Sequence, residues 1–228
     1  MAEFGADTFH RPVDQSILSA FEAVWDGLAT AGTWWTASER VAIVAATRRS
    51  LRLPLGETAP DIAGLSDAVG PDGLSPLTLE VVRRLAVDAG RITRDWATAA
   101  IERMGQGPYV ETVALVVQTV PIDMLCDLLG RPRQDLPVPG RGEPSRVVPD
   151  GLGQEGAFVP WAVDGWSGPN VARALSFVPD DNARRMGIVT SMYSGRHFEE
   201  MVWRHRALSR PQVELVAART SAVNECFY

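Results

Sequence analysis

Residues that define secreted or metal-binding proteins are scarce in this sequence. Only two of the 228 residues are cysteine, Cys126 and Cys226, and only three are histidine. Two cysteines do not make a disulfide framework, so we expect reduced thiols in a cytoplasmic protein. His10, His197 and His205 have no metal-ligand spacing with other candidate ligands. The sequence therefore predicts neither a metal site nor another bound cofactor.

Excess positive charge and long apolar runs are also lacking. Lys and Arg total 22 against 28 Asp and Glu, a net charge of -6, which argues against a nucleic-acid-binding surface. The N-terminal residues MAEFGADTFHRPVDQ lack the basic start and apolar core of a signal peptide. The most apolar stretch, 110–129, is interrupted by Glu111, Gln118, Asp123 and Asp127. We therefore expect no membrane span, which needs roughly 18 uninterrupted apolar residues.

Helical patterning runs through the first half of the chain. Asp14 is placed to cap a helix whose apolar residues share one face. Thr36 and Glu39 have capping-box spacing, so a second helix should start there, and Ser75-Pro76 should begin a third. A shorter helix is expected over 94–104.

The next expected helix, 109–129, is apolar enough to lie in the core. Pro121 should kink it or split it in two, and Gly130 should end it. Cys126 sits among its apolar residues and is expected to be a core thiol. Residues 131–168 are rich in proline and glycine and predict an irregular connector.

Helical patterns resume after the connector and complete an all-α fold. We expect helices over 170–178, 180–193 and 197–208, and a last one from Ser209 to about Asn224 that starts with capping-box spacing to Gln212. No segment shows sustained strand alternation. ERVAIVAATRRSL, starting at Glu39, aligns without gaps on ELVAARTSAVNEC, starting at Glu214. The match predicts two related lobes: residues 1–130, a connector 131–168, and the start of a second lobe, 169–228.

The last fifteen residues carry a spacing that points to redox chemistry. Glu214 precedes Cys226 by twelve positions, with apolar helix residues between them and Asn224 just before the cysteine. This pattern resembles the alkylhydroperoxidase D-like (carboxymuconolactone decarboxylase) family, where a helical glutamate precedes a Cys-x-x-Cys-x-x-x-His motif by the same interval. The segments LSPLTLEVVRRLAVDAGRITRDW, GPYVETVALVVQTVPIDMLCDLLG and GEPSRVVP also resemble two-lobed members of that family. The resemblance implies an alkylhydroperoxidase D-like helical fold whose second lobe is incomplete in these 228 residues.

The resemblance also implies a function, a thiol- or selenol-dependent peroxidase. Cys226 would be the resolving thiol and Glu214 the relay acid, and Tyr228 stands where some members carry a relay histidine. The substrate would be a hydroperoxide, the reductant a cellular dithiol, and the assembly a homo-oligomer. Glu39 matches Glu214 in the first lobe, but Leu51 and Pro54 stand where its cysteines would be.

The family's second cysteine would fall at position 229 and its histidine at 233, beyond Tyr228. Two expectations remain open: a shortened thiol enzyme, inactive at this length, or a selenoprotein whose UGA codon was taken as a stop. Two other functions also remain open. One is a decarboxylase of the same family, which needs no redox thiol pair. The other is a non-catalytic helical assembly protein.

Overall fold

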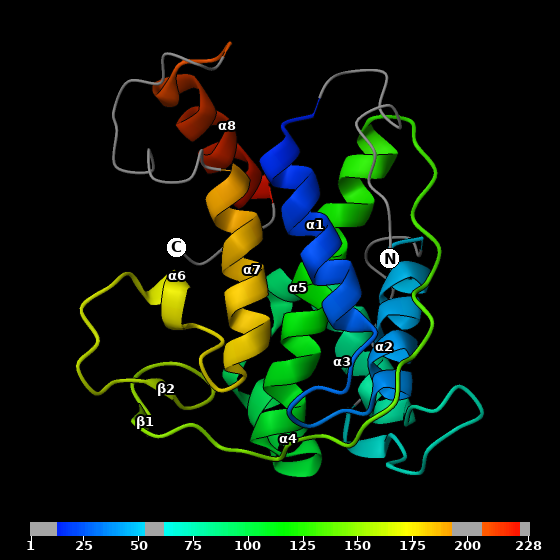
Figure 1. Ribbon diagram of the computed structural model, residues 1–228. Helices are drawn as coiled ribbons and strands as arrows, with labels where there is room; N and C mark the ends of the chain where they lie inside the picture. Colours follow the sequence, from blue (N-terminus) through cyan, green and yellow to red (C-terminus); the bar gives the residue numbers. More distant parts are fainter. Residues whose placement is uncertain (1–12, 53–61, 193–206, 224–228) are drawn as a thin grey trace.

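The fold of the chain is all-α in class (Figure 1). The computed structural model describes residues 13–52, 62–192 and 207–223. Within these ranges the elements, in chain order, are α1 (Gln15–Leu28), α2 (Ala37–Ser50), a 3-10 turn η2 (Ile62–Gly64), α3 (Pro76–Val87), a 3-10 turn η3 (Ala89–Arg91), α4 (Arg94–Met104), α5 (Gln106–Leu128), β1 (Leu152–Gly153), β2 (Trp161–Ala162), α6 (Asn170–Arg173), α7 (Pro179–Met192) and α8 (Arg210–Val223). The two strands pair antiparallel, Leu152 with Ala162 and Gly153 with Trp161.

Local side-chain hydrogen bonds start the helices where the sequence predicts. Asp14 accepts from the Ser16 backbone N–H at the start of α1. Thr36 and Glu39 form both halves of a capping box at α2, and each half satisfies a backbone donor that the first helical turn leaves free. At α3, Ser75 accepts from the Thr78 N–H, with proline at the first helical position.

Three other expectations about helices have different outcomes. Pro121 is expected to kink or split the helix, but α5 is continuous from Gln106 to Leu128, so it is not split. Helix α6 has four residues, Asn170–Arg173, where a longer helix is expected. The expected helix over 197–208 lies almost wholly outside the described residues.

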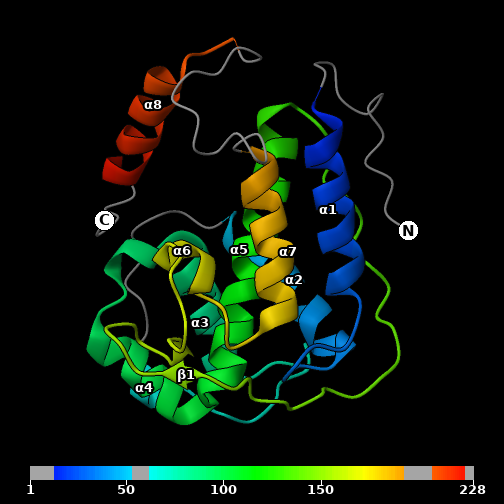
Figure 2. The ribbon, with the colours of Figure 1, turned by 60° about the vertical axis from the view of Figure 1, so that its left-hand side comes forward.

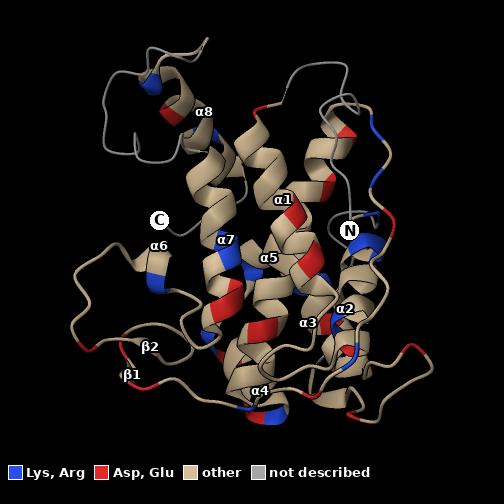
Figure 3. Cartoon of the chain, viewed as in Figure 1, with Lys and Arg blue, Asp and Glu red and all other residues tan. Residues whose placement is uncertain are grey.

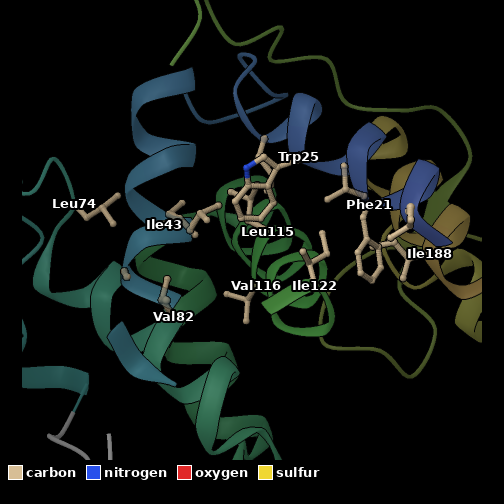
Figure 4. Close-up of a cluster of buried hydrophobic side chains, with 14 residues drawn as sticks. Phe21, Trp25, Ile43, Leu74, Val82, Leu115, Val116, Ile122 and Ile188 are labelled. Carbon is tan, nitrogen blue, oxygen red and sulfur yellow. The ribbon is translucent and has the colours of Figure 1, made fainter. Parts of the chain in front are cut away.

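Helix α5 is the centre of the bundle. It packs against α1, α2, α3, α4 and α7, and Figure 4 shows Leu115 and Ile122 of α5 on the side of Trp25 and Phe21 of α1 in the shared apolar cluster. By length and composition α5 could cross a membrane, but 67% of its most apolar window is buried inside this structure. That burial is what a central core helix requires.

The core includes residues from both sides of the proline-rich segment. Helix α7 follows residues 131–168, yet its main packing partners are α1 and α5, and Ile188 joins the same apolar cluster as Phe21 (Figure 4). The segment is irregular apart from β1 and β2, and it hydrogen-bonds to the turn between α1 and α2. Gly140 N–H donates to Ala29 O at 2.8 Å, and Arg146 N–H to Thr33 O at 2.8 Å.

Helix α8 contributes no buried residue, and Figure 2 shows it set apart from the bundle. The apolar side chains of Leu215 and Val216 are 72% and 60% exposed. Helices α2 and α8, aligned by the internal match, do not start in register. Glu39 is the third residue of α2 and Glu214 the fifth of α8.

Candidate functional site

Glu214 is the one predicted site residue that lies in the described part of the chain. It sits on α8 with its side chain 47% exposed, and it pairs with Arg210, one turn earlier, whose Nε lies 3.2 Å from Glu214 Oε1. A surface ion pair at this spacing contributes little to stability. The Glu214 carboxylate is therefore held only loosely and is accessible to solvent.

Cys226 and Tyr228 lie outside the described residues. The three predicted site residues are thus linked by sequence spacing, and the structure gives no distance between them.

Cys126, the other cysteine, is a core residue as expected. It is 2% exposed near the end of α5, and no disulfide partner is present among the described residues. Burial, together with the charges of Asp123 and Asp127, raises the pKa of the Cys126 thiol, against the opposing charges of Arg48 and Arg133. A thiol that is buried and held neutral is a poor nucleophile, so Cys126 is unsuited to redox chemistry.

The most concentrated polar group in the described core is a buried charge cluster, formed by Arg40 of α2, Glu111 of α5 and Asp181 of α7. All three side chains are at most 3% exposed. The Arg40 guanidinium donates to Glu111 Oε1 and to both Asp181 oxygens, at 2.8 and 2.9 Å. The cluster therefore ties together three helices that are far apart in sequence (Figure 1).

Backbone and neighbouring side chains complete the cluster. Trp34 N–H donates to Glu111 Oε2 at 2.5 Å, and Arg40 Nη2 donates to Gly27 O at 3.3 Å. Asp181 also receives Arg184 Nη1 at 3.2 Å and Gln118 Nε2 at 3.4 Å. Two guanidinium groups thus face two carboxylates, which is the pairing that buried charges need.

Burial and pairing act in opposite directions on these groups. Burial opposes the charged form of Asp181, but its hydrogen bonds and charge attraction to Arg40 outweigh this and hold its pKa below the ordinary value. Glu111 differs, because burial and the negative charge of Asp181 raise its pKa despite Arg40. Of the two carboxylates in the cluster, Glu111 is therefore the one that is more easily protonated.

Close packing around the cluster leaves no room for a substrate. A Cβ added at Gly32 would overlap Glu111 Oε1 and Arg40 Nη1, so only glycine fits there. The cluster has the chemistry of an acid–base site, but its side chains are sealed from solvent. We interpret it as a structural tie between α2, α5 and α7.

A metal centre finds no support in the described part of the chain. No group of three or more His, Cys, Asp and Glu side chains is arranged there to hold a metal ion.

The chain matches no protein-family model, no curated protein and no solved structure in the comparisons made with it.

The charge cluster is absent from the sequence-based predictions, although one signal for it exists. Glu111 and Gln118 are seven residues apart on an otherwise apolar helix, which places them on one face. Two polar residues on the buried face of a core helix require a partner, and Arg40 in the apolar run of α2 is a matching cation.

Proposed function

We propose that this chain is part of a thiol- or selenol-dependent peroxidase in which Cys226 is the resolving thiol and Glu214 relays protons. The observation that carries the proposal is the twelve-residue interval from Glu214 to Cys226 in an all-α chain. Tyr228, two positions after the cysteine, would donate a hydrogen bond to the reacting group.

The proposed reaction uses a second thiol or selenol three positions after Cys226. Its anion attacks the peroxide, the O–O bond breaks, the alcohol leaves, and a sulfenic or selenenic acid forms. Cys226 then displaces water from that acid and closes the disulfide or selenenylsulfide. A dithiol reductant restores the pair, so one hydroperoxide and one dithiol yield an alcohol, water and a disulfide.

Of the two cysteines in the sequence, Cys126 is the one that lies in the described part of the chain. Cys126 is buried and its thiol is held neutral, which leaves Cys226 as the residue for exchange chemistry. Glu214 supports this role because its carboxylate is solvent-accessible on α8. The same proposal includes a cytoplasmic location, a homo-oligomeric assembly, and no nucleic-acid or membrane partner.

The test is thiol–disulfide exchange with an aromatic disulfide at neutral pH. We expect one fast-exchanging thiol per native chain, lost in Cys226→Ser and kept in Cys126→Ser. Glu214→Gln should slow the fast phase by about tenfold or more, because assisted proton transfer is lost. Glu155→Gln, a change at another exposed glutamate, should leave the rate unchanged.

Two results would contradict this role for the site. One is a Cys226 rate equal to that of the same thiol in a short peptide of residues 214–228. The other is equal rates for Glu214→Gln and wild type, which would remove Glu214 from the chemistry.

A second candidate function, a non-catalytic helical assembly protein, is favoured by helix α8. Its exposed apolar side chains, Leu215, Val216 and Val223, are the kind of surface that protein contacts cover. An assembly protein predicts ordinary reactivity for Cys226 and no effect of Glu214→Gln, so the same exchange experiment separates the two functions.

A further inference from the structure

An arginine-lined cleft of about 670 Å³ lies where the end of α2 meets the chain leaving α5. Arg48 and Arg52 come from the α2 end, and Arg131 and Arg133 from the segment after α5. Figure 3 shows this positive charge at the end of α2 and along the adjoining loop. The cleft is separate from Glu214 and from the buried charge cluster.

The end of α5 is built to direct this loop. Gly130 has a φ of 65°, and the N–H groups of Gly130 and Arg131 donate to Asp127 O at 3.1 Å and Cys126 O at 2.7 Å. This is a Schellman motif, which reverses the chain after a helix. Trp25 Nε1 then donates to Asp135 O at 3.0 Å and anchors the loop to α1.

Two of the four arginines are engaged with carboxylates. Arg48 donates to both oxygens of Asp123 at 2.8 Å, and Arg133 donates to Asp127 at 3.0 and 2.5 Å. These bidentate pairs hold the walls of the cleft together.

The other two arginines are Arg52 and Arg131. Within the part of the chain that the structure describes, the side chains of Arg52 and Arg131 make no hydrogen bond and no ion pair. Arg131 Nε is buried and has no hydrogen-bond partner there. The four guanidinium groups lie near three carboxylates, those of Asp123, Asp127 and Asp135. The cleft and its surroundings therefore carry one net positive charge.

We propose that this cleft binds a phosphate group, with Arg52 and Arg131 donating to its oxygens and Arg48 and Arg133 holding the walls. A planar guanidinium matches the spacing of phosphate oxygens, and two of them match a dianion. The sequence contains no lysine, so all of its permanently cationic side chains are arginines. The cleft exceeds the size of a phosphate ion, so a small organic phosphate fits as well.

Isothermal titration calorimetry on the 228-residue chain tests the proposal. The probes are inorganic phosphate and glycerol 3-phosphate, each at low and high salt. Arg52→Gln and Arg131→Gln should each weaken binding by about tenfold, because each removes a charge-assisted hydrogen bond. Tighter binding of the ester identifies an organic phosphate as the ligand, and equal binding identifies the free ion.

Arg49→Gln is the matched control. Arg49 lies in the last turn of α2, three residues before Arg52, but it pairs with Asp72, 3.3 Å away, and does not line the cleft. The Arg52 and Arg131 variants should also keep the wild-type unfolding temperature, since their side chains make no hydrogen bonds in the described structure. Absence of binding for both probes would overturn the proposal. So would an equal weakening of binding by Arg49→Gln, or unchanged binding in a variant that combines Arg52→Gln with Arg131→Gln.

Discussion

Replacing Arg40 with methionine should destabilise the fold more than any surface change on the same helix. Methionine keeps much of the side-chain volume but removes the guanidinium that Glu111 and Asp181 share. Asp181 would still receive Arg184 and Gln118, whereas Glu111 would retain only backbone donors from Trp34 and Trp35. The main cost therefore falls on Glu111.

The size of the effect follows from the burial of the pair. Removing one partner of a buried ion pair costs about 3–5 kcal/mol, against a total stability of about 5–15 kcal/mol for a folded domain. For a chain of this size that is a fall of about 6–20 °C in Tm. Protonation of Glu111 would relieve part of the cost.

The loss should therefore depend on pH. Without Arg40, the pKa of Glu111 in the folded state moves further above its unfolded value of about 4.3. The folded variant then binds more protons than the unfolded chain, so its stability falls as pH rises through that range. We expect a larger difference between variant and wild type at pH 8 than at pH 5.

Urea denaturation followed by circular dichroism at both pH values measures this. The control is Arg49→Met, whose side chain is 56% exposed and pairs with Asp72; it should cost less than about 1 kcal/mol. Equal losses for the two variants, or a loss for Arg40→Met that does not change with pH, would refute the reasoning.

Two more predictions follow from the core. Gly32→Ala should destabilise the fold by about 1–3 kcal/mol because its Cβ would overlap Glu111 and Arg40, whereas Gly187→Ala, with open space in α7, should be neutral or stabilising in the same denaturation assay. A loss at Gly187 as large as at Gly32 would contradict this. The pKa of Cys126 is raised in the folded protein, so as the pH rises above the ordinary thiol pKa of about 8.5 the unfolded thiol ionises first. The stability that the neutral thiol contributes at lower pH is therefore lost at higher pH. Cys126→Ala should flatten the fall in Tm above that pH, and an unchanged slope would exclude Cys126 as its cause.

Helix starts could be predicted from the sequence because capping is local. Thr36 and Glu39 are three residues apart, and their side chains satisfy each other's backbone donors in any context that allows a helix. Helix α6 could not be predicted as well. After Arg173 the chain makes tight turns that bury Leu175, Phe177 and Val178, and Pro179 disfavours a helical conformation at Val178.

The buried cluster depends on tertiary contacts that sequence spacing does not reveal. Glu111 is 71 residues from Arg40, and Asp181 is 141 residues from it. The helical period places Glu111 on a buried face, but nothing local selects its partner. The arginine cleft has the same origin, since it joins the end of α2 to a loop that a Schellman motif directs.

The nucleotide sequence after the codon for Tyr228 tests the peroxidase proposal most directly. The proposal predicts a cysteine codon or an in-frame UGA at position 229, with a histidine codon at position 233 and further helical sequence beyond it. A codon for any other residue at position 229, or a UAA or UAG stop, would leave Cys226 without the partner that the reaction requires and would contradict the proposal.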